Sequence, residues 1–80
     1  MTHTVEDPGT FFPLAKETAE NLPAGLTVHQ VLPAADGSRA HCLWEAPSVD
    51  DVRNLIDPAT VGISVNEYFE VNPDEAIGLP

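Results

Sequence analysis

The sequence has few basic residues and no long apolar run. Only three of its 80 residues are Lys or Arg, against thirteen Asp and Glu, which gives a formal net charge of -10. Because Lys and Arg drive phosphate binding, we expect no nucleic-acid partner and no binding to anionic membranes. No apolar stretch approaches the ~20 residues that span a bilayer, and no secretory signal peptide is recognisable. The length predicts one domain.

Cys42 is the only cysteine, so the chain forms no internal disulfide. It lies in an apolar run between His41 and Leu43, which predicts a buried structural thiol. His41 is a poor partner for a nucleophile there, because neighbouring strand residues point to opposite faces. A single unpaired cysteine without a signal peptide is typical of the reducing cytoplasm, where we expect this protein.

The N-terminal part predicts a short strand and then a helix. A β-compatible start at 3–5 is followed by Asp7-Pro8, a typical N-cap with proline in the first helical position. The apolar stripe of this helix, at helical spacing, consists of Phe12, Ala15, Ala19 and Leu22. Pro13 removes a backbone hydrogen bond, so we expect either a kink or a separate first turn.

The rest of the chain predicts a hairpin, a second helix and a last strand. Asp36-Gly37 favours a hairpin turn between two apolar runs. Ser48 is the expected N-cap of the second helix, and Asp57-Pro58 is its expected end. The expected elements are strands over 26–32, 39–46 and 63–71, a helix over 49–56, and an irregular tail over 72–80.

The resulting order, β-α-β-β-α-β, is that of an α+β, ferredoxin-like domain. This plan has a four-stranded antiparallel sheet, with strand order 4-1-3-2 and both helices on one face. We expect a single domain over 1–80, with its core at about 3–71. The second face of the sheet is open, and a small chain usually covers such a face by association. We therefore expect a homodimer.

The length of the hairpin loop decides which side chains share a face. A three-residue loop, 35–37, pairs Gln30 with Cys42 and places His29 and His41 together on the open face. The members of that face would be His29, Val31, His41, Leu43 and Glu45, opposite a core face of Val28, Leu32, Ala40, Cys42, Trp44 and Ala46. A loop of two or four residues instead places His29 with Cys42 and Trp44. We favour the three-residue loop.

On the favoured register, His29 and His41 are diagonal neighbours on adjacent strands. With Glu45, and with His3 from the first strand as a further candidate, they suit a divalent metal such as nickel or zinc. The same imidazoles suit acid–base chemistry near neutral pH. A third interpretation is that they line a dimer contact. No strong metal motif such as HxxxH or CxxC is present.

Three aromatic residues, Trp44, Tyr68 and Phe69, are more typical of a core or an interface than of a ligand cage. Tyr68 carries a hydroxyl that needs a partner when buried. We therefore keep Tyr68, with His41, as a candidate catalytic residue.

Three segments resemble a known group of proteins. "DGSRA" at 36–40, "CLWEAPSVDDVR" at 42–53 and "NEYFEV" at 66–71 are similar to small bacterial proteins of unknown function in the ferredoxin-like, dimeric α/β-barrel superfamily. The resemblance covers about residues 25–71. It implies a dimeric barrel, and some members of the group are described as nickel-binding. Related barrels include small cofactor-independent oxygenases and isomerases.

These observations lead to three functional hypotheses. The first is a homodimer whose sheet-face pocket binds a divalent metal or a small ligand through His29, His41 and Glu45. The second is a cofactor-independent enzyme, with His41 or His29 as the base and Tyr68 as a hydrogen-bond donor to an oxyanion. The third is a structural or regulatory subunit. We expect a binding protein rather than an enzyme.

Overall fold

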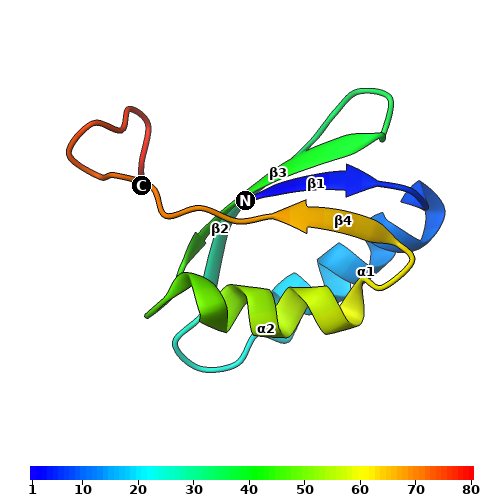
Figure 1. Cartoon of the computed structure of the whole chain (residues 1–80), viewed down its shortest axis with the longest axis horizontal. Helices are drawn as coiled ribbons and strands as arrows, with labels where there is room; N and C mark the ends of the chain where they lie inside the picture. The colour runs from blue at the N-terminus through cyan, green and yellow to red at the C-terminus, as the bar shows by residue number, and fades with distance from the viewer.

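The computed structural model describes residues 1–80 and has the predicted succession of elements (Figure 1). They are β1 (Thr2–Val5), α1 (Pro8–Glu20), β2 (Thr27–Pro33), β3 (Arg39–Glu45), α2 (Val49–Ala59) and β4 (Ser64–Glu67). The strands form one antiparallel sheet in the order β2-β3-β1-β4, which is the predicted order read from the other edge. The prediction of an α+β domain with a four-stranded antiparallel sheet and two helices is confirmed.

Helix α1 begins where the sequence predicts. Asp7 is its N-cap: the backbone N–H of Thr10 donates to Asp7 Oδ1 at 3.3 Å, and the Thr10 hydroxyl donates to Oδ2 at 2.8 Å. The helix runs without interruption past Pro13, so no separate first turn forms. A proline here removes one intrahelical bond, which the neighbouring turns tolerate.

Helix α2 has the predicted N-cap but a later end. The N–H of Asp51 donates to Ser48 Oγ at 3.2 Å. The predicted stop at Asp57-Pro58 is wrong, because the helix continues to Ala59. Pro58 lies in the last turn, and the Thr60 hydroxyl satisfies the Ile56 carbonyl at 2.9 Å. Neither helix is long and apolar enough to cross a membrane.

The hairpin between β2 and β3 differs from the favoured prediction. The N–H of Ala34 donates to the carbonyl of Arg39 at 2.8 Å, so the loop has four residues, 35–38, and not three. Pairing is consequently shifted by one residue near the loop, with Val31 opposite Cys42. A β-bulge between Val28 and Gln30 then absorbs one extra residue, and Val28 lies opposite Trp44 as predicted.

The shift exchanges two apolar side chains between the sheet faces. Cross-strand partners share a face, so Val31 joins Cys42, while Leu32 joins His41 and is 56% exposed. We call these the Cys42 face, which also carries His3, and the His41 face. The sequence prediction had placed Val31 and Leu32 the other way round. Strand β4 is also shorter than predicted, and the chain is irregular after Glu67.

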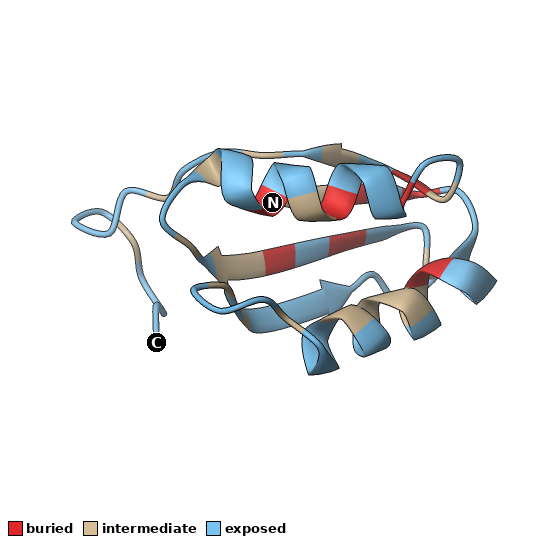
Figure 2. Ribbon diagram, turned by 90° about the horizontal axis from the view of Figure 1, so that it is seen from below, coloured by how far each residue is buried: buried red, intermediate tan, exposed pale blue.

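The core is small. Only nine of 80 residues are buried, and Figure 2 shows that they lie on the strands, on parts of the helices and at the turn after α2. Val5, Phe11 and Ala40 form its centre. Both helices are drawn below the sheet in Figure 1, and side chains from α1, α2 and the Cys42 face line one apolar cavity of about 40 Å³. Burial on this scale leaves little margin of stability for a lone chain.

Candidate functional site

A wide groove lies at the end of the sheet where β3 runs past β1. Strand β1 begins at Thr2, opposite His41, so the last residues of β3 have no strand beside them on that side. The start of α2 and the chain after β4 form the other walls. The groove has a volume of about 650 Å³, within the range of small-molecule sites. Its polar and aromatic lining comprises His29, Trp44, Glu45, Ser48, Asp50, Tyr68, Phe69 and Glu70.

His29 and Glu45 form the polar pair of this groove. His29 is the residue left out of the ladder by the β-bulge, and its Nε2 lies 3.4 Å from Glu45 Oε1. The His29 side chain is 27% exposed and that of Glu45 is 79% exposed. Two of the three predicted metal-binding residues are therefore neighbours, and both line the groove.

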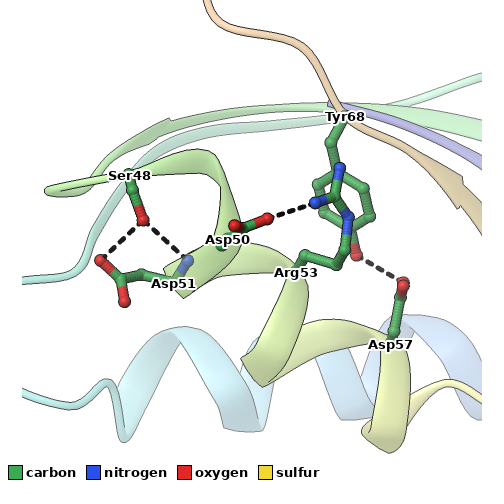
Figure 3. Close-up of polar contacts among 6 residues, drawn as sticks. All are labelled: Ser48, Asp50, Asp51, Arg53, Asp57 and Tyr68. Carbon is green, nitrogen blue, oxygen red and sulfur yellow. Dashed lines mark hydrogen bonds and ion pairs between the residues drawn. The ribbon is translucent and has the colours of Figure 1, made fainter.

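The side chain of Tyr68 points from the segment after β4 towards α2, as Figure 3 shows. Its hydroxyl donates to Asp57 Oδ1 at 2.7 Å, and the Arg53 guanidinium lies 5.1 Å from the centre of its ring. Burial, followed by the neighbouring Asp57 carboxylate, raises the pKa of Tyr68 above its ordinary value. The phenol therefore stays protonated at neutral pH and fixes this wall of the groove to α2.

The groove is acidic. Glu45, Asp50 and Glu70 line it, whereas no Lys or Arg does. Arg53 pairs with Asp50 from the neighbouring turn of α2, as Figure 3 shows. In a chain of net charge -10, this arrangement makes the groove attractive to cations.

The other two histidines lie outside the groove. His41 is exposed, and its Nδ1 lies 3.1 Å from Thr2 Oγ1. It does not line the cavity that Tyr68 lines, so the two candidate catalytic residues do not share it. His3 is 3% exposed on the Cys42 face, so the expectation that it approaches His41 is wrong. The reason is parity: Thr2 pairs with His41, which directs the next residue to the opposite face.

Within this single chain, no group of three or more His, Cys, Asp or Glu side chains is placed to hold a metal ion. His29 and Glu45 are one pair, and His41 contacts Thr2 instead.

A buried polar network on the Cys42 face was not foreseen from the sequence. His3 stands at its centre: its Nε2 lies 3.2 Å from Cys42 Sγ, and its Nδ1 lies 2.5 Å from Asn66 Oδ1. The ring also packs edge-on against Phe11, with ring centres 4.9 Å apart. Asn66 in turn donates from Nδ2 to Asp57 Oδ1 at 3.0 Å and to Thr60 Oγ1 at 2.8 Å.

The network specifies where its protons lie. The Asp57 carboxylate only accepts, so the amide nitrogen of Asn66 faces it and the amide oxygen faces His3. His3 must then carry its proton on Nδ1, which leaves the lone pair of Nε2 directed at Cys42. The Cys42 thiol is therefore the donor to His3. The chain of bonds from α2 thus sets the tautomer of a buried histidine.

Burial shifts the pKa values of Cys42 and His3 in the directions that favour their neutral forms. Desolvation raises the pKa of Cys42 to about 11 and lowers the pKa of His3. At neutral pH the pair is a neutral thiol beside a neutral imidazole. The hydrogen bonds from Asn66 and Tyr68 hold the pKa of Asp57 below its usual range, so the far end of the network is a carboxylate.

Trp44 has a buried donor without a partner. Its indole Nε1 is inaccessible and makes no hydrogen bond. Trp44 follows Cys42 by two residues on β3 and therefore shares its face. Both side chains line the groove as well as the small apolar cavity. An unpaired buried N–H is rare because it costs about 1–3 kcal/mol.

Sequence reasoning missed Asn66 and the pairing of His3 with Cys42. The alternation of strand residues offered a partial signal, since a polar Asn between Val65 and Glu67 fits either face. Comparison with protein-family models, with curated proteins and with solved structures finds no match for this chain.

Proposed function

We propose that this protein binds a small, positively charged ligand in the groove at the end of β3. The supporting observation is the composition of the groove: three acidic side chains line it, and no Lys or Arg side chain does. Trp44, Tyr68 and Phe69 add aromatic surface, and aromatic faces attract organic cations. The His29–Glu45 pair supplies a hydrogen-bond acceptor and a carboxylate at one wall.

A divalent metal is the second candidate cation. Neutral imidazole together with carboxylate suits nickel or zinc, and His29 and Glu45 lie 3.4 Å apart. These two side chains supply fewer ligands than such a metal takes in a protein site, so water or a second chain would complete the coordination.

Thermal unfolding tests the proposal with three probes: nickel chloride, zinc chloride and tetramethylammonium chloride, each against sodium chloride at equal ionic strength. A bound cation at roughly ten times its Kd raises Tm by about 5–10 °C. Glu45→Gln should reduce this shift because it removes one of the three groove carboxylates, the one beside His29. Glu20→Gln, an exposed change on α1 outside the groove, is the matched control and should retain it. If none of the three salts raises Tm beyond the sodium control, the proposal is wrong.

We further propose a ferredoxin-like homodimer, in which both helices cover the Cys42 face and a second copy covers the His41 face as a dimeric α/β barrel. Two observations support it. Both helices contribute to the cavity under the Cys42 face. The His41 face carries Leu32, 56% exposed, and Val65, 57% exposed, on a chain with a small core.

Sedimentation equilibrium tests the dimer. The wild-type chain should sediment at twice its monomer mass of 8.6 kDa. Leu32→Asp should give monomers, because it buries a charge in the contact. Val61→Asp, at a position that is 79% exposed after α2, should remain dimeric. A monomeric wild type at micromolar concentration, or a dimer that survives Leu32→Asp, would contradict this arrangement.

A further inference from the structure

We propose that Cys42 accepts acyl groups from short activated esters and thioesters, with His3 as its general base and Asn66 as the residue that positions His3. This inference does not rest on cation binding, since none of these three residues supplies the charge of the groove.

The geometry of the three residues carries the proposal. A nucleophile, a base in contact with it and a third group that orients the base form the arrangement used in nucleophilic catalysis. Here Cys42 Sγ lies 3.2 Å from His3 Nε2, and His3 Nδ1 lies 2.5 Å from Asn66 Oδ1. The Asn66 amide is itself fixed by Asp57 and Thr60, so the imidazole presents its lone pair to the thiol.

The position of Cys42 between two cavities defines the substrate class. Its side chain lines both the wide groove and the apolar cavity of about 40 Å³. The groove admits an ester or thioester, while the inner cavity has room for a group no larger than a short acyl chain. Trp44 borders the same two spaces and adds apolar surface to both.

The step transfers one acyl group. Cys42 Sγ attacks the carbonyl carbon, and its proton moves to His3 Nε2. As the bond from that carbon to the leaving oxygen or sulfur breaks, His3 returns the proton to the leaving group. The products are an S-acylated Cys42 and a free alcohol or thiol, without any change in oxidation state.

Reaction of the 80-residue chain with p-nitrophenyl acetate provides the test. We expect one equivalent of p-nitrophenolate per chain in a rapid phase, with one acetyl group located on Cys42 by peptide mass mapping. Cys42→Ala should abolish the phase. His3→Gln should slow it about 100-fold, the usual contribution of a general base. Glu20→Gln, an exposed change on α1 that lines neither cavity, is the control and should react at the wild-type rate.

The pH profile of the wild-type rate decides the mechanism without relying on a variant that folds. Attack assisted by neutral His3 levels off near or below pH 6.5, since burial lowers the pKa of His3. Unassisted attack by a thiolate with a pKa of about 11 rises about tenfold per pH unit beyond pH 8. The charged groups that act on His3 are the N-terminal ammonium and His41, both of which lower its pKa further.

Asn66→Ala tests the positioning role separately. The hydrogen bond from Asn66 raises the pKa of His3, so its loss should move the plateau to lower pH while slowing the reaction. If Asn66→Ala only unfolded the protein, its pH–rate profile would show no plateau at all. The proposal is overturned if Cys42 is not acylated, if the wild-type rate rises steadily to pH 9, or if a folded His3→Gln reacts like wild type.

Discussion

Phe11→Ala is expected to remove most of the free energy of unfolding of the protein. Phe11 is 3% exposed and joins the core cluster with Val5 and Ala40, while its ring also contacts His3 edge-on. Removing a buried phenylalanine costs about 3–5 kcal/mol. Small domains have a total stability of about 5–15 kcal/mol, and this one has a small core at the low end of domain size.

Urea unfolding followed by far-UV circular dichroism measures the effect at one fixed protein concentration, because association would add to the apparent stability. Phe69→Ala is the matched control, since Phe69 is 63% exposed. It should shift the unfolding free energy by less than about 0.5 kcal/mol. A Phe11→Ala variant as stable as the control would show that the cluster around Val5 does not hold the sheet and α1 together.

Asn66→Ala is expected to reduce the unfolding free energy by about 2–5 kcal/mol. The change leaves His3 Nδ1 and the Ser64 hydroxyl without their shared acceptor, because both contact Asn66 Oδ1. These residues are 3% and 8% exposed, so water does not readily replace the amide. Each buried polar group left without a partner costs about 1–3 kcal/mol.

Asn66→Ala also removes the hydrogen bonds that join β4 to the end of α2. Asn66 Nδ2 bridges to Asp57 and Thr60, so the same amide joins the last strand to the end of the helix. Asn54→Ala, on the exposed side of α2, removes an amide of equal size with no side-chain hydrogen bond and serves as the control. If Asn66→Ala and Asn54→Ala had equal unfolding free energies in urea, the hydrogen bonds of Asn66 would not contribute to stability.

Local patterns predicted the elements well, because each depends on neighbours in sequence. Asp7 and Ser48 cap their helices through bonds that span three residues. The strand order also followed from the succession of elements. The predicted end of α2 at Asp57 was wrong, because a proline in a last turn costs only one hydrogen bond.

The candidate site was less accessible to sequence reasoning. The sequence predicted that His29 and His41 are diagonal neighbours and that Glu45 shares their face; in the structure it is His29 and Glu45 that lie 3.4 Å apart. That prediction assumed a three-residue hairpin loop. The loop has four residues, and the bulge at His29 returns the strands to the predicted register from Val28 towards the start of β2. The separation of His41 from that pair could not be derived from the hairpin alone.

The sequence by itself determined the order of the helices and strands, their caps and the acidic character of the chain, because these properties reside in adjacent residues or in composition. Only the tertiary structure decided that His3, Cys42 and Asn66 are in contact, and that β3 extends past the end of β1 and leaves a groove there. The His3–Cys42 contact joins residues that are 39 positions apart in the sequence, and the His3–Asn66 contact joins residues that are 63 positions apart. Both contacts depend on how three strands align, because a register shift of one residue moves every side chain of a strand to the opposite face of the sheet.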